Sequence, residues 1–99
     1  MAKTTNAYRW GYCSLSIEGK STLEEREDII TRAIDMYLSN VDETNVRGET
    51  YEGRIKQTSG YQFVAPGFSG IEYQAEVENR KGKSKFKFLI SEKVREELN

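Results

Sequence analysis

Residues 71–90, IEYQAEVENRKGKSKFKFLI, contain two alternating segments on either side of a short polar loop. From Ile71 to Val77 every second residue is apolar, and the residues between them are glutamate or glutamine. The returning segment places lysines on one parity and Phe86 and Phe88 on the other. Period-two alternation is typical of strands with one buried and one solvated face, so this stretch predicts a β-hairpin.

The length of the loop fixes how the two strands pair. A slip of one residue would move the apolar set to the wrong face, and a four-residue loop over residues 79–82 avoids that slip. Gly82 would take the left-handed conformation that closes such a loop. The predicted outer pairs are Glu78 with Lys83, Glu76 with Lys85 and Gln74 with Lys87, and the predicted inner pair is Tyr73 with Phe88.

The same hairpin accounts for the basic run between Arg80 and Lys87. Five positive residues with two interleaved phenylalanines would otherwise indicate a nucleic-acid surface. Cross-strand neighbours of opposite charge instead predict a solvated face whose charge pairs contribute roughly 0.2–1 kcal/mol each. Only Arg80 and Lys81, at the tip, have no acidic residue opposite them in this register.

A helix is predicted over about residues 22–39. Ser21 and Glu24 form a capping-box pattern, and the acidic residues that follow favour the positive end of a helix dipole. Apolar residues then recur at spacings of three and four, which is the stripe of a helix packed on a sheet. These residues are Leu23, Ile30, Ala33, Ile34, Tyr37, Leu38 and Val41.

Further strands are predicted on both sides of this helix. Residues 8–18 predict a strand whose inward face changes parity, which a bulge near Gly11 or Tyr12 would reconcile. Residues 51–57 and 61–65 predict a second hairpin. Its loop is Thr58-Ser59-Gly60, which sets Ile55 opposite Phe63.

The remaining segments predict connections. Residues 40–50 show no periodicity and predict an acidic loop, and residues 66–70 predict a flexible connection before the strand at residue 71. The 99 residues, of which 36% are hydrophobic, suffice for one core, so a single α+β domain over residues 8–99 is expected after a flexible tail at residues 1–7. The predicted fold is an antiparallel sheet of about five strands packed on one long helix, in the order β-α-β-β-β-β, with a short C-terminal helix capped by Ser91.

Composition argues against several classes of function. The net charge of −1 disfavours sequence-independent binding to nucleic acid or an anionic membrane, for which a positive excess supplies the affinity. Histidine is absent, which removes the usual general base and the commonest zinc ligand. The single cysteine, Cys13, cannot form an internal disulfide, and no apolar run is long enough for a membrane span. We therefore expect no enzymatic activity, no cofactor, no metal and a cytoplasmic location.

These exclusions favour a small non-enzymatic protein that binds another macromolecule, in the first place a protein, as a regulator or inhibitor. Binding residues favour loops on a rigid scaffold, and an aromatic residue in a loop of Pro, Gly and Ser either folds back as a lid on the core or acts as an exposed anchor. The oligomeric state stays open. The expected partner-binding residues are Phe68, Arg80, Lys81, Asp42, Glu43 and Glu49.

Two alternatives remain open. Single-stranded nucleic acid would bind through sheet aromatics and the basic hairpin at residues 80–87, with strong dependence on salt. A small ligand would lie between helix and sheet, where buried tyrosine hydroxyls need partners. The residues expected for nucleic acid are Tyr8, Arg9, Trp10, Arg80 and Lys81, and those for the small ligand are Tyr37, Tyr51, Tyr61 and Tyr73.

Overall fold

The computed structural model describes residues 12–65 and 68–91, without the side chains of residues 12–17, 59 and 61–68. The tail at residues 1–7, the strand start at 8–11 and the helix expected after Ser91 lie outside this part of the chain. The predicted order β-α-β-β-β-β is confirmed. The elements are β1 (Tyr12–Gly19), α2 (Leu23–Ser39), β2 (Glu43–Arg47), β3 (Tyr51–Ala65), β4 (Phe68–Asn79) and β5 (Gly82–Ser91).

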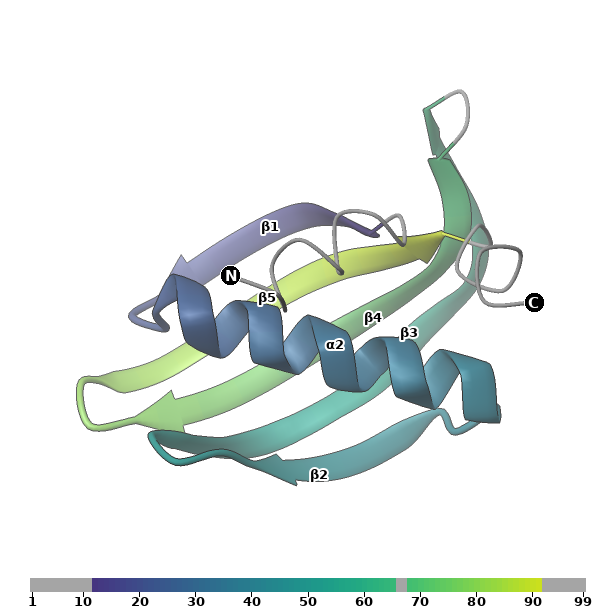
Figure 1. Ribbon diagram of the computed structural model, residues 1–99. Helices are drawn as coiled ribbons and strands as arrows, with labels where there is room; N and C mark the ends of the chain where they lie inside the picture. Colours follow the sequence, from purple (N-terminus) through teal and green to yellow (C-terminus); the bar gives the residue numbers. More distant parts are fainter. Residues whose placement is uncertain (1–11, 66–67, 92–99) are drawn as a thin grey trace.

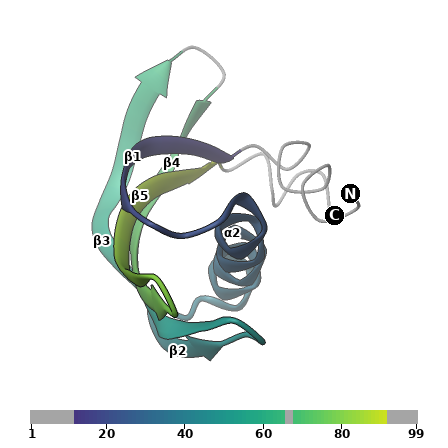
Figure 2. The same cartoon turned by 90° about the vertical axis from the view of Figure 1, so that its left-hand side faces the viewer.

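The five strands form one antiparallel sheet in the order β1-β5-β4-β3-β2. Helix α2 lies along one face of this sheet, and the β3–β4 hairpin extends beyond the ends of the other strands (Figures 1 and 2). The predicted α+β fold class is therefore confirmed. No helix in the described part of the chain is long and apolar enough to cross a membrane.

The core lies between α2 and the sheet. The helix buries Ile29, Ala33 and Ile34 completely, because they share the face that the 3.6-residue period turns toward the strands. Phe86 and Phe88 lie in the same core with their ring centroids 5.8 Å apart. The aromatic residues of the basic run therefore pack against the helix and are not a stacking surface for bases.

The register predicted for the β4–β5 hairpin is confirmed at all four pairs. Its turn is organised by Asn79, whose Oδ1 accepts hydrogen bonds from the N–H groups of Lys81 (2.8 Å) and Gly82 (3.2 Å). Gly82 has φ +138, a conformation that residues with a Cβ rarely adopt.

The capping box of α2 is shifted by one residue from the predicted one. Thr22, not Ser21, is the N-cap: its Oγ1 accepts from the Glu25 N–H at 3.1 Å, and the Thr22 N–H donates to Glu25 Oε1 at 2.9 Å. Both Ser-x-x-Glu and Thr-x-x-Glu fit the motif here. Glu25 is buried and accepts hydrogen bonds from Thr50 and Asn79, and this position of Glu25 selects Thr22 as the N-cap.

Two segments predicted as loops are strands. Residues 43–47 form edge strand β2, which buries Val46 and leaves Glu43, Asn45 and Arg47 exposed, so the acidic-loop prediction for residues 40–50 is wrong. The connection predicted at 66–70 is also too long, because β4 already begins at Phe68 and pairs with Ala65.

The predicted hairpin over residues 51–65 is wrong as well, because these residues form the single strand β3. The Thr58-Ser59-Gly60 segment forms an irregularity within β3. It lies between the pairs Gln57–Tyr73 and Tyr61–Ile71, where three residues of β3 stand against the single residue Glu72 of β4. The described part of β1 has a register shift between Ser14 and Ser16, and Gly11, where a bulge was predicted, lies outside the described residues. Strand β4 is long enough to pair with all of β3, and this pairing outweighs the local turn signal.

Candidate functional site

The face of the sheet opposite α2 carries cross-strand rows of charged side chains. One row contains Arg47, Glu52, Glu78 and Lys83, and the next charged row contains Asn45, Arg54, Glu76, Lys85 and Glu18. Neighbours within a row form ion pairs, with Arg47 Nη2 3.1 Å from Glu52 Oε1 and Lys85 Nζ 4.0 Å from Glu76 Oε2. Two more ion pairs, Arg54–Glu43 at 3.2 Å and Lys87–Glu72 at 4.0 Å, continue the pattern on this face.

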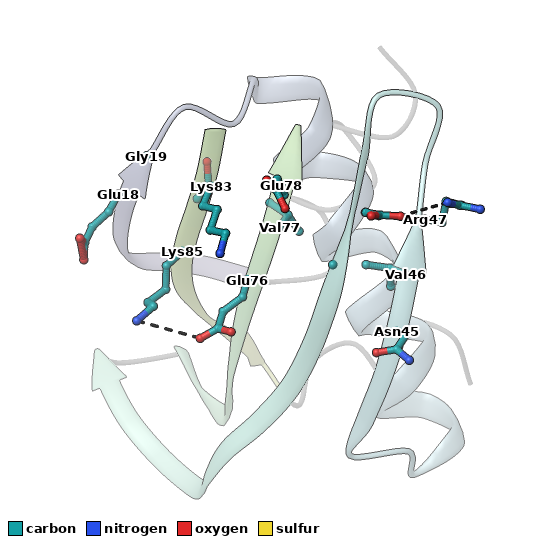
Figure 3. A pocket seen from close by; sticks show the side chains of 13 residues that line it. Glu18, Gly19, Asn45, Val46, Arg47, Glu76, Val77, Glu78, Lys83 and Lys85 are labelled. Carbon is teal, nitrogen blue, oxygen red and sulfur yellow. Dashed lines mark hydrogen bonds and ion pairs between the residues drawn. The ribbon is translucent and has the colours of Figure 1, made fainter. Parts of the chain in front are cut away.

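A hollow of about 900 Å³ lies between these two rows, and we call it the outer groove (Figure 3). Its floor is the intervening row, which crosses all five strands in the order Val46, Gly53, Val77, Ser84, Gly19. Its walls are the charged rows on either side: Arg47, Glu52, Glu78 and Lys83 form one wall, and Asn45, Glu76, Lys85 and Glu18 form the other.

The floor of the outer groove is backbone, because the side chains of this row point to the opposite face of the sheet. A Cβ on Gly53 would lie 2.1 Å from the carbonyl oxygen of Glu76, so only glycine allows these strands to approach as they do. Gly19 has φ +102, and an added Cβ would lie 2.5 Å from the Lys83 carbonyl oxygen. The side chains of Val46 and Val77 point to the opposite face, where they belong to the core.

The groove walls carry charges of both signs. They combine three cationic side chains with four carboxylates, all exposed at the surface. No group of three or more His, Cys, Asp or Glu residues that could hold a metal ion occurs in the described part of the chain. Side chains of both signs can form charge pairs with a bound molecule.

A second polar cluster joins the start of α2 to the β2–β3 turn and to the β4–β5 turn. Glu25 Oε2 accepts from Thr50 Oγ1 at 2.6 Å, and Glu25 Oε1 accepts from Asn79 Nδ2 at 2.8 Å. Burial by itself would raise the pKa of Glu25, but the hydrogen bonds from Thr50, Thr22 and Asn79 outweigh it and lower the pKa below its ordinary value. The carboxylate is therefore held ionised as a structural bridge.

Tyr51 forms the neighbouring bridge. Its hydroxyl donates to Asp28 Oδ2, which also accepts from Arg32 Nε at 3.1 Å. Burial first, and the hydrogen bond to Asp28 next, raise the pKa of Tyr51 to about 12. Arg32 in turn donates from Nη2 to the carbonyl of Arg47 at 3.2 Å. These groups are engaged with one another, which favours a structural role for the cluster.

The predicted partner-binding residues lie at several places in the described fold. Arg80 and Glu49 both line a hollow of about 450 Å³ that adjoins the outer groove through shared residues Arg47, Glu52 and Glu78. Lys81 is exposed in the same turn as Arg80.

The other predicted residues lie elsewhere. Glu43 is paired with Arg54 at 3.2 Å, and the carbonyl of Asp42 accepts from the Gln57 N–H at 2.8 Å, at the opposite end of β2 from Glu49. Phe68 begins β4, and its side chain lies outside the described part of the chain.

The residues expected for nucleic acid and for a small ligand lie in different parts of the chain. Tyr8, Arg9 and Trp10, expected for nucleic acid, lie outside the described residues. Of the tyrosines expected for a small ligand, Tyr51 gives its hydroxyl to Asp28, and Tyr73 is buried with its ring stacked on Phe88. Tyr37 packs against the same core, and the side chain of Tyr61 is not described.

Sequence reasoning missed the outer groove. The two glycines of its floor, Gly19 and Gly53, are no signal for it, because they lie in the row whose side chains point to the core. Comparisons of the chain with protein-family models, with curated proteins and with solved structures found no match.

Proposed function

We propose that this protein is a non-enzymatic binding protein that holds a segment of another protein in the outer groove, and that it regulates or inhibits that partner. The observation that carries the proposal is the groove, a hollow of about 900 Å³ that crosses the full width of the sheet. A hollow of this size lies within the range of small-molecule and cofactor sites.

The charge of the walls favours a protein over a nucleic acid as the partner. A nucleic-acid strand presents phosphates of one sign, and four carboxylates facing three cations would repel it. A polypeptide with side chains of both signs can match both walls. The adjoining hollow is also lined by charges of both signs, Arg80 from the β4–β5 turn and Glu49 from the β2–β3 turn.

Charge reversal at one wall residue tests this proposal. Lys85→Glu changes a groove wall, whereas Lys56→Glu makes the same change on the same face of the sheet, outside the groove. Both lysines are exposed, so the free energy of unfolding should change by less than about 1 kcal/mol in either variant. Each variant and the wild type would be immobilised and used to capture partners from native cell extract, with identification by mass spectrometry.

We expect the wild type and Lys56→Glu to retain the same protein, and Lys85→Glu to retain at least about tenfold less of it. Nuclease treatment of the extract should leave this capture unchanged. Capture that disappears after nuclease treatment would assign the protein to the nucleic-acid alternative. Equal capture by Lys85→Glu and Lys56→Glu would remove the outer groove as the binding site.

A further inference from the structure

Strand β2 is an edge strand whose outer side is open. It pairs with β3 alone, and no described residue of the chain pairs with its other edge. In Figure 1 it forms the lower border of the sheet. An exposed edge presents backbone N–H and C=O groups that can accept another strand.

The pairing with β3 shows which residues face outward. The Gly48 N–H donates to the Tyr51 carbonyl and the Gln57 N–H donates to the Asp42 carbonyl, both at 2.8 Å. Hydrogen-bonded pairs alternate in an antiparallel ladder, so the even-numbered residues of β2 bond to β3. The N–H and C=O groups of the odd-numbered residues, Glu43, Asn45 and Arg47, therefore point to the open edge.

The sequence of β2, Glu43-Thr44-Asn45-Val46-Arg47, is complementary to itself when reversed. A two-fold axis at Asn45 sets Asn45 opposite its own copy and Glu43 opposite Arg47 of the second copy, twice. These are the residues whose backbone groups face outward, so hydrogen bonding and side-chain charge agree on one register. We propose that β2 pairs antiparallel with β2 of a second copy of this chain, which joins the two sheets into one.

The charges of the outer face continue across this junction. Within one chain, Lys56 lies opposite Glu43 and Arg47 lies opposite Glu52. In the dimer the sequence along a row becomes Lys56, Glu43, then Arg47 and Glu52 of the second copy, with alternating sign throughout. Opposite charges across strands stabilise pairing and like charges oppose it, so this register is the favourable one.

Two existing hydrogen bonds are compatible with the dimer. The carbonyl of Arg47 accepts from Arg32 Nη2 at 3.2 Å, and the carbonyl of Asn45 accepts from Thr44 Oγ1 at 3.3 Å. A carbonyl oxygen has two lone pairs and can accept a second donor from the partner strand. Because only five residues of each chain pair, we expect a dimer at the weak end of specific interfaces.

The test exchanges the charges of Glu43 and Arg47 and measures the oligomeric state. Sedimentation equilibrium of the full chain from about 10 μM to about 1 mM should show the wild type passing from monomer to twice the chain mass. Glu43→Arg and Arg47→Glu should each weaken the dimer by about tenfold or more, because each sets like charges opposite each other twice. The double variant carrying both changes should return to within about threefold of wild type.

Arg54→Glu is the matched control. It breaks the ion pair between Arg54 and Glu43 within one chain but leaves the β2 sequence unchanged, so the dimer should persist. Circular dichroism confirms that each variant is folded. A wild type that stays monomeric over the whole concentration range overturns the proposal. So does a double variant that dimerises no better than the single ones.

Cross-linking tests the register independently of charge. In a Cys13→Ser background, Asn45→Cys should form a disulfide-linked dimer on mild oxidation, because Cα atoms of a hydrogen-bonded pair lie about 5.5 Å apart. Glu43→Cys alone should not, since its copy would lie four residues away along the strand, roughly 13 Å. A mixture of Glu43→Cys and Arg47→Cys should cross-link. Cross-linking of Glu43→Cys alone at the rate of Asn45→Cys would rule out this register.

Discussion

Neighbouring glutamates in the first turn of α2 have different roles. Glu24 is exposed, whereas Glu25 is 5% exposed and accepts hydrogen bonds from residues in two distant turns, Thr50 and Asn79. From the sequence both looked like charges that favour a helix dipole. Side-chain burial, which depends on tertiary packing, separates them, and a single sequence carries no signal for it.

The pair allows a matched prediction. Glu25→Gln should lower the free energy of unfolding at pH 7 by about 1–3 kcal/mol, because it replaces a buried charged acceptor with an amide that cannot satisfy the same donors. Glu24→Gln should cost less than about 1 kcal/mol, since it loses only an exposed dipole interaction. Urea denaturation of both variants and of the wild type measures the difference.

The pH dependence has a defined sign. The pKa of Glu25 in the folded state lies below its ordinary value of 4.5, so its stabilising contribution is present at neutral pH and lost as pH falls through the folded pKa. The gap in stability between wild type and Glu25→Gln should therefore narrow below about pH 4.5. A gap that widens on acidification would contradict the assignment of Glu25 as an ionised bridge.

At the scale of elements, the sequence predicts those whose signal is local. The β4–β5 hairpin has alternation on both arms and a turn with Gly82, and its predicted register is confirmed. Strand β2 has five residues and buries only Val46, too few for a period to be recognised. Strand β3 contains Thr58-Ser59-Gly60, a strong turn signal that its long partner β4 overrides.

The N-terminus of α2 gives the second prediction. Thr22→Ala should lower the free energy of unfolding by about 1 kcal/mol, because it removes the side-chain acceptor of the Glu25 N–H. Ser21→Ala should change it by less than about 0.5 kcal/mol, since the Oγ of Ser21 has no hydrogen-bond partner among the described residues. Thermal unfolding followed by circular dichroism distinguishes them. A larger loss for Ser21→Ala would restore Ser21 as the cap.

At the scale of the whole molecule, the candidate site depends on contacts between distant strands. The outer groove forms where two charged rows from all five strands lie on either side of the row that contains Gly19, Gly53 and Ser84, residues separated by dozens of positions in the sequence. Sequence analysis could pair Glu76 with Lys85 within one hairpin. It could not place Glu18 beside Lys85, or Arg47 on the opposite wall, because that requires the order of all five strands.

Gly53 and Gly60 test how the shape of the sheet depends on this row. Both lie in β3, but a Cβ on Gly53 would lie 2.1 Å from the Glu76 carbonyl oxygen, whereas nothing lies within 4 Å of one on Gly60. Gly53→Ala should therefore force β3 and β4 apart and lower the free energy of unfolding by about 1–3 kcal/mol or more. Gly60→Ala should stay within about 0.5 kcal/mol of wild type. Equal stability of the two variants in urea would mean that β3 and β4 approach less closely at Gly53, and the floor of the outer groove would then be wrong.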